Sequence, residues 1–120
     1  MKHVLGLLIF LMISGSVYSQ VDSLKYQELK KQILSQTKEG GQLDFFSPIK
    51  GHEYDGVEIK PKIFTTKLGV ALMKWGKANY EMGITKIEDA YLIYSEYKGR
   101  KINQREVEYI RMGFNRELDR

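Results

Sequence analysis

The sequence contains no cysteine, and this absence excludes several kinds of protein. Without thiols the chain has no disulfide framework, no thiolate nucleophile and no cysteine zinc site. Histidine is scarce as well, because His52 is the only one after the first nineteen residues. A metal site usually needs three or more well-placed ligands. No glycine-rich phosphate loop, nucleophile elbow or His-Glu-x-x-His motif is present either, so we expect no metal and no cofactor.

The chain also lacks an apolar run long enough to span a membrane. Its longest apolar stretch lies within residues 1–19 and reaches only about 15 residues, where a span needs about 20. Lys2 precedes this stretch, and Val17 and Ser19 supply the small or slim side chains that a signal peptidase requires. The pattern predicts a signal peptide over residues 1–19, cleaved before Gln20. An uncleaved membrane anchor is the alternative interpretation.

Residues 20–120 have the length of one small domain. They carry eighteen basic side chains against fifteen acidic ones, a net charge of +3 that by itself names no partner. Small secreted animal domains are usually held together by disulfides, so an exported chain without cysteine points to a bacterial envelope. We therefore expect a periplasmic or secreted protein with no nucleic-acid partner.

Apolar residues recur at helical spacing in four stretches. Spacings of three and four residues place them on one side of a helix. The expected helices, caps included, cover about residues 22–38, 65–82, 85–98 and 103–118. We predict a mainly α fold, a small helical domain of three to four helices. It should be built on the last three, with the first helix docked or partly detached.

Two tetrapeptides have the pattern of a capping box, in which a side chain and a glutamate satisfy each other's backbone donors. They are Thr85–Glu88 and Asn103–Glu106. Each predicts the start of a helix, the third and the fourth. Because only Gly99–Ile102 joins these two helices, they should form an α-hairpin.

Residues 42–59 lack helical periodicity and contain turn formers. A turn is expected at residues 55–56, before the alternating Val57–Ile59. We predict an irregular segment with one short hairpin between the first two helices. Pro61 excludes a continuous helix at this point. A strand over Ile63–Leu72 is the alternative to the start of the second helix.

Three glycines recur every seventh residue in the second expected helix: Gly69, Gly76 and Gly83. An interior glycine costs a helix about 1 kcal/mol relative to alanine. The spacing therefore predicts that another backbone comes close to this stripe.

His52, Glu53 and Asp55 form the only cluster that mixes a histidine with acids. Glu53 and Asp55 could act as acid and base in glycoside cleavage, and the three together could hold a metal ion. A polar surface turn is the simpler interpretation and the one that we favour.

Five tyrosines have two interpretations. They could form a stacking platform for sugar rings, or they could pack in the core with their hydroxyls at its rim. The second is favoured, because the pattern places Tyr91, Tyr94 and Tyr97 beside Ile87 and Ala90 on the inward side of the third helix. They are Tyr80, Tyr91, Tyr94, Tyr97 and Tyr109.

A group of lysines gives the clearest candidate for a contact surface. Residues 60–77 contain five lysines and no acid. Lys67, Lys74 and Lys77 share one side of the second helix, with Trp75 a short way round the axis. These four are the predicted partner-binding residues, and lipid headgroups, an acidic polysaccharide or an acidic protein face would suit them. Ordinary solvated lysines are the alternative.

The sequence thus favours a non-enzymatic protein-interaction module of the bacterial envelope. Its partner would be an envelope protein or an anionic component of the cell surface. The main alternative is an enzyme or inhibitor that acts on cell-wall glycan and uses Glu53 and Asp55. A membrane-active cationic helix ranks third.

Overall fold

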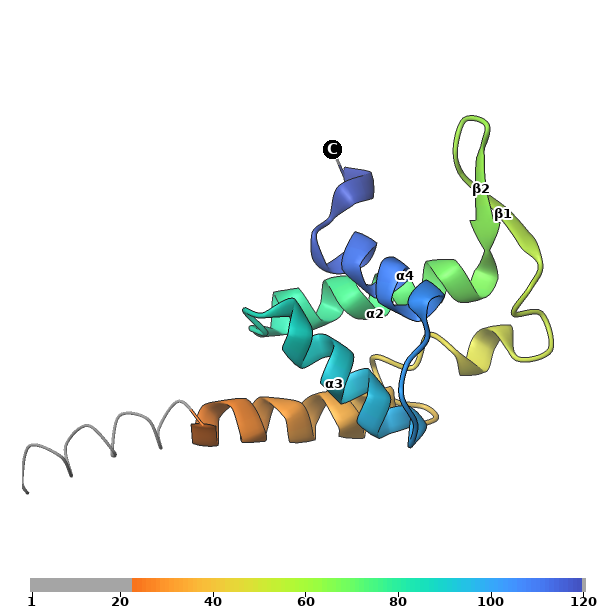
Figure 1. Cartoon of the computed structure of the whole chain (residues 1–120). Coiled ribbons are helices and arrows are strands. Elements are labelled where there is room, and N and C mark those ends of the chain that lie inside the picture. Colours follow the sequence, from red (N-terminus) through yellow and green to blue (C-terminus); the bar gives the residue numbers. More distant parts are fainter. Residues whose placement is uncertain (1–22, 120) are drawn as a thin grey trace, which may run out of the picture.

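The structure, a computed structural model, describes residues 23–119, and the predicted leader over residues 1–19 lies outside them (Figure 1). The described part is mainly helical, as predicted. Its helices are a first helix over residues 23–37, α2 (Lys67–Met82), α3 (Ile87–Lys98) and α4 (Gln104–Phe114). The other elements are the strands β1 (Gly56–Lys60) and β2 (Ile63–Thr66) and the 3-10 turns η1 (Ser47–Ile49) and η2 (Glu117–Asp119).

The start of α2 lies where the sequence predicts it. The Thr66 hydroxyl accepts a hydrogen bond from the Gly69 N–H at 3.0 Å and caps the helix. Of the alternative strand over Ile63–Leu72, only the first four residues are extended. α2 ends at Gly83, whose left-handed φ of 116° a residue with a side chain would rarely adopt.

The capping box predicted at Thr85–Glu88 is wrong. α3 begins at Ile87, with Lys86 at the N-cap position, and no side chain caps it. The helix therefore starts one residue later than a Thr85 cap requires. Ile84 fixes the connection, because its side chain is buried and its N–H bonds to the Asn79 carbonyl at 3.0 Å.

The second capping box is present in full. The Asn103 side chain accepts from the Glu106 N–H, and the Glu106 carboxylate accepts from the Asn103 N–H, both at 2.8 Å. α4 ends at Phe114 and does not reach Leu118 as predicted. Arg116, with a φ of 51°, turns the chain out of the helix.

The predicted hairpin is present, but its turn lies at Pro61-Lys62 rather than at residues 55–56. Pro61 fixes its own φ, and Lys62 adopts a left-handed φ of 66°. The Glu58 carboxylate stabilises this conformation, because it accepts from the Lys62 N–H at 3.0 Å. The turn at residues 52–55 only leads the chain into β1.

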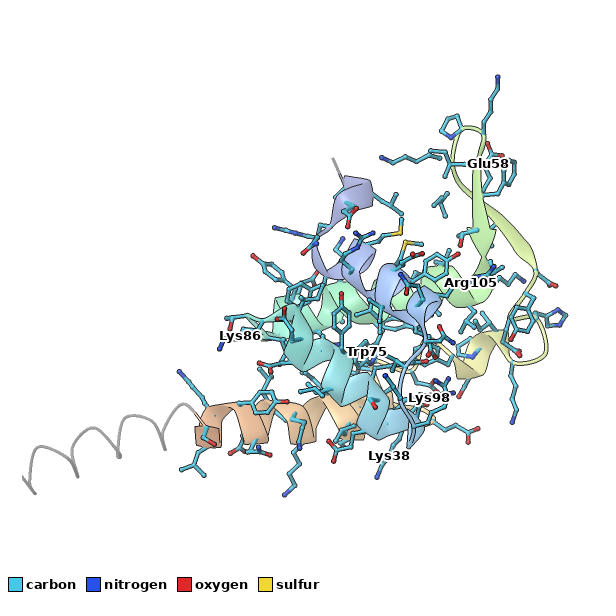
Figure 2. All side chains as sticks on the ribbon, viewed as in Figure 1. Lys38, Glu58, Trp75, Lys86, Lys98 and Arg105 are labelled. Carbon is cyan, nitrogen blue, oxygen red and sulfur yellow. The ribbon has the colours of Figure 1, made fainter. Side chains whose placement is uncertain are left out.

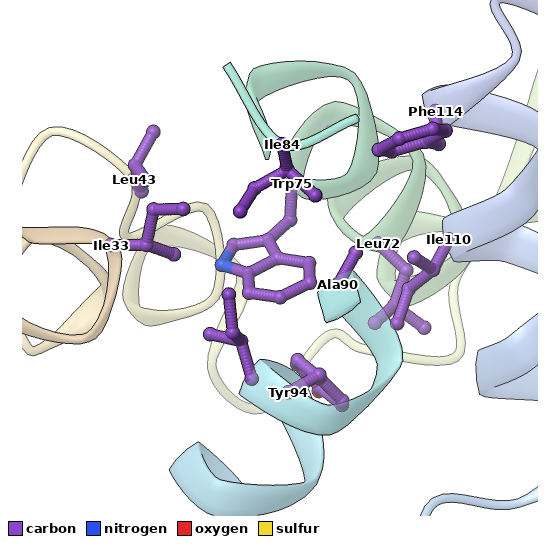
Figure 3. Packing of buried hydrophobic residues seen from close by; sticks show 10 residues of the cluster. Ile33, Leu43, Leu72, Trp75, Ile84, Ala90, Tyr94, Ile110 and Phe114 are labelled. Atoms are coloured by element: carbon purple, nitrogen blue, oxygen red, sulfur yellow. The ribbon is translucent and has the colours of Figure 1, made fainter. Parts of the chain in front are cut away.

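Trp75 lies at the centre of the core and is completely buried. Figure 3 shows Ile33 and Leu43 on one side of the indole and Ala90 and Tyr94 on the other. The rest of the buried cluster consists of Leu72, Ile84, Ile93, Ile110 and Phe114. Every helix contributes to this one core.

The first helix is docked on the core through a polar relay. The Trp75 indole N–H donates to the Thr37 hydroxyl at 2.9 Å, and that hydroxyl donates to the Ile33 carbonyl at 2.6 Å. A buried indole N–H needs such a partner. Of the two predicted arrangements for this helix, docked or partly detached, the docked one is therefore correct.

α4 packs mainly along α2 and only lightly against α3, so the predicted α3–α4 hairpin is not the main packing unit. Glycines allow the two backbones to approach. A Cβ on Gly76 would collide with the Ile110 carbonyl, and one on Gly113 with the Met73 carbonyl. Of the glycine stripe, Gly76 therefore shows the predicted approach of another backbone, whereas Gly69 faces the side chains of Thr65 and Tyr109. The contribution of Gly113 was not predicted.

Among residues 23–119, no helix is both long enough and apolar enough to cross a bilayer.

Candidate functional site

The cluster of His52, Glu53 and Asp55 is a polar turn at the surface. The His52 Nδ1 lies 3.0 Å from the Asp55 carboxylate, and 66% and 53% of these side chains are exposed. Asp55 also lies 3.8 Å from the Lys67 ammonium, and Glu53 accepts from the Gly51 N–H. Within residues 23–119, no three potential ligands converge as a metal site would require.

The two carboxylates of the predicted enzyme do not share a cleft. A groove of about 660 Å³ lies between η1, the end of α3 and the start of α4. Glu53 lines this groove, whereas Asp55 does not. Arg100 and Glu106, which bind each other, also line the groove.

Arg100 and Glu106 form a two-pronged ion pair that the sequence analysis missed. The guanidinium donates to both carboxylate oxygens, at 2.9 and 2.8 Å. Hydrogen bonds from Arg100 hold the pKa of Glu106 below its usual range, although only 6% of this residue is exposed. Since the same carboxylate also caps α4, the pair fixes the connection between α3 and α4.

Tyr94 lies in the core, and Tyr91, Tyr97 and Tyr109 pack against it, as favoured above. Tyr94 is buried and meets the Trp75 ring edge-on at 5.1 Å between ring centroids. Burial raises its pKa. The Tyr109 hydroxyl accepts from the Thr65 hydroxyl at 2.8 Å and so joins α4 to β2. Tyr80 remains half-exposed, with the Arg116 guanidinium 5.1 Å from its ring centre.

Only part of the predicted lysine surface is a free surface. The Lys67 ammonium lies near Asp55, and the Lys77 ammonium lies 3.0 Å from the Asp119 carboxylate. Lys74 is exposed, and the ion pairs within residues 23–119 do not use it. Trp75 points into the core instead, because neighbouring residues on a helix point about 100° apart (Figure 2).

A small apolar groove lies beside Lys74. We call it the α2–α4 groove, and its volume is about 250 Å³. Its floor is apolar and consists of Ile59, Val70, Met73, Met112 and Leu118. Three cations, Lys74, Lys77 and Arg116, line its rim together with the acid Asp119. Sequence reasoning missed this groove because its two methionines meet only where α2 crosses α4.

The β1–β2 hairpin is the most exposed apolar element. It projects from the helical body (Figure 1), and 68% of Phe64 and 50% of Ile63 are exposed. Its sheet has only these two strands, so both outer edges are unpaired within residues 23–119. An unpaired strand edge exposes N–H and C=O groups to which another chain can bind.

No family model, curated protein or solved structure matches this chain. The function is therefore argued from the geometry described above.

Proposed function

We propose that this protein is a non-enzymatic interaction module of the bacterial envelope that docks onto another envelope protein through its β1–β2 hairpin. The observation that carries the proposal is the exposure of Phe64 and Ile63 on an element that stands away from the core. A large apolar side chain that stays exposed on a projecting element is a candidate anchor for a partner.

The hairpin is fixed at its base and projects at its tip. At the base, the Thr65 hydroxyl bonds to Tyr109 and the Lys67 N–H bonds to the Asp55 carbonyl at 2.9 Å. An isolated two-stranded hairpin is at best marginally stable in water. These anchors hold the tip in one orientation, which lowers the entropy that a partner must remove on binding.

The strand register places Phe64 on the outer face. Successive residues of a strand point to opposite faces, and the Thr65 side chain is turned toward α4, where it reaches Tyr109. Phe64 therefore points away from α4, and its cross-strand neighbour is Glu58. A large aromatic ring in this position can enter a pocket on a partner, as interface anchors commonly do.

The lysine side of α2, made of Lys67, Lys74 and Lys77, extends the proposed contact. Its charge suits a partner with an acidic surface, because complementary charges steer association and fix its register. Trp75 is not part of this contact. Export is supported by the leader pattern of residues 1–19. For an exported chain, the absence of cysteine favours a bacterial envelope.

The competing hypothesis, a cell-wall enzyme or inhibitor that uses Glu53 and Asp55, has less support. Asp55 lies outside the groove that Glu53 lines, and it is bound to His52. A glycosidase needs its two carboxyl groups to flank the same glycosidic bond.

Photo-crosslinking in the native host tests the proposal. The full chain carries p-benzoylphenylalanine in place of Phe64 or, as a matched control, in place of Leu92, which is 63% exposed on α3. We expect the Phe64 position to crosslink to one envelope protein and the Leu92 position not to. Equal crosslinking from both positions, or none from either, would contradict the proposed docking through the hairpin. The mass of the purified host protein reports whether residues 1–19 have been removed.

A further inference from the structure

The α2–α4 groove has the size of a few side chains and not of a cofactor. Its volume of about 250 Å³ lies below the roughly 300–1,000 Å³ of pockets that enclose small molecules. Two of the floor residues, Met73 and Met112, have flexible and polarisable side chains that adapt to different apolar groups. The groove therefore fits aliphatic side chains of a polypeptide.

The C-terminal turn of the protein already places such a group against the groove. Leu118 lies on the floor, and the next residue, Asp119, forms the 3.0 Å ion pair with Lys77 on the rim. The preceding residue, Glu117, lies 3.7 Å from Arg111. Leu118 thus lines the groove beside an acid, Asp119, whose carboxylate binds a cation of the rim. Arg111, the partner of Glu117, does not line the groove.

The groove also has a rim cation that is not paired with an acid of the described residues. Lys74 stands on the rim, exposed, and no ion pair within residues 23–119 uses it. Ile59, Val70 and Met73 are apolar residues of the same groove. Charge complementarity therefore favours an acidic group above Lys74 and an apolar group beside it.

We infer that the α2–α4 groove binds a short segment of the partner protein in which aliphatic side chains lie next to Asp or Glu. This inference rests on the proposed function and names the chemistry of the partner. Ile59 belongs to β1 and also lines the groove, so the groove adjoins the hairpin.

Fluorescence anisotropy tests this inference with the full chain and two labelled peptides. The probe is a seven-residue peptide, Glu-Leu-Asp-Gly-Glu-Leu-Asp, and the control peptide has lysine in place of every acid. We expect the acidic peptide to bind and the lysine peptide not to. Rising salt should weaken this binding, since its charges lie at the surface. Equal binding of the two peptides, or of neither, would overturn the inference.

Charge variants test which side chains carry the binding. Lys74→Glu reverses an exposed charge on the rim and should weaken binding about tenfold, a loss typical of a charge partner at an interface. Lys86→Glu is the matched control, since Lys86 is equally exposed but lies outside the groove, and it should change nothing. Asp119→Ala should strengthen binding, because it releases Lys77. A purely structural role for these residues would not produce a gain.

The remaining outcomes separate this inference from the proposed function. If the peptide fails to bind while the Phe64 crosslink persists, only the groove inference is wrong. If sedimentation shows a dimer that Asp119→Ala abolishes, the occupant is the C-terminal turn of a second copy, and the inferred partner segment is wrong. Binding of the chain to anionic lipid vesicles that Lys74→Glu abolishes, with no peptide binding, would overturn it in favour of a lipid surface.

Discussion

The core around Trp75 and the β1–β2 hairpin differ in whether their polar groups and apolar side chains have partners within the protein. In the core, the indole N–H, the Thr37 hydroxyl and the Ile33 carbonyl bind one another, and apolar side chains surround them. In the hairpin, both strand edges are unpaired within residues 23–119 and Phe64 meets solvent. The first region can be understood without a partner, whereas the second has the features of a surface that gains by acquiring one.

α2 belongs to both regions. Leu72 and Trp75 face the core, whereas Lys74 faces the rim of the α2–α4 groove. One helix therefore holds the fold together on one side and presents the candidate contact on the other. Substitutions on the two sides should separate stability from binding.

The largest effect is expected in the core. Trp75→Ala removes the central side chain and leaves the Thr37 hydroxyl without its donor, so we expect unfolding to become easier by about 3–5 kcal/mol. Urea titrations followed by circular dichroism measure this. Leu92→Ala, at an exposed position, should cost less than about 0.5 kcal/mol. A similar loss in both variants would mean that the core is not centred on Trp75.

A smaller loss is expected where α2 crosses α4. Gly113→Ala puts a methyl group against the Met73 carbonyl and should destabilise the protein by about 1–3 kcal/mol, as overpacking commonly does. Helix propensity alone would give the opposite sign, a gain of about 1 kcal/mol. Glu81→Ala, at an exposed site of α2, is the control that measures the effect of an added alanine on helix stability. Stabilisation by Gly113→Ala would show that the backbones do not approach there.

The pH dependence of stability should depend on Glu106. Its pKa is lower in the folded protein than the ordinary value of 4.5, so the stabilisation is fully present above that value and is lost as pH falls through the lowered pKa. Thermal melts from neutral to acid pH measure this loss. Glu106→Gln should melt at a lower temperature at neutral pH and lose less of its stability on acidification. An unchanged acid profile would contradict the role of the Arg100 pair.

Phe64→Ser should leave stability almost unchanged, within about 0.5 kcal/mol, because the side chain is exposed. Copurification of the envelope partner should nevertheless be lost. The contrast with Trp75→Ala defines the two regions experimentally, since one variant loses the fold and the other loses the contact. A marked fall in melting temperature for Phe64→Ser would mean that the hairpin supports the fold after all.

We expect the unsubstituted protein not to clear peptidoglycan. The double variant Glu53→Ala with Asp55→Ala should therefore behave identically in a clearing assay. Clearing by the unsubstituted chain that disappears in the folded double variant would establish the enzyme hypothesis in place of the interaction module.

The helices were predictable because their signals are local. Thr66 at the start of α2 and Asn103 with Glu106 at the start of α4 are read directly from spacing, and both caps are present. The capping box at Thr85 had the same local pattern and failed. The burial of Ile84 decided where α3 begins, and a four-residue pattern does not contain that information.

The candidate sites were less predictable because they depend on contacts between distant residues. The spacing of α2 separates Trp75 from Lys74 by about 100°, but the burial of the indole depends on contacts with the first helix at Thr37 and with α3. Gly113 is not part of a repeated glycine spacing, so its close approach to α2 could not be predicted from the sequence. The methionines of the groove, Met73 and Met112, lie far apart in the chain and meet only through the crossing that Gly113 permits.

The relay from the indole to Thr37 gives the molecule an optical reporter of its own. Trp75 is the only tryptophan in the chain, so its emission comes from a single place. Detachment of the first helix would admit water to the ring and shift that emission to longer wavelengths. A partner that contacts only the hairpin tip would leave it unchanged. Loosening of the first helix can therefore be followed by the emission wavelength of Trp75 in the unsubstituted protein, without any label.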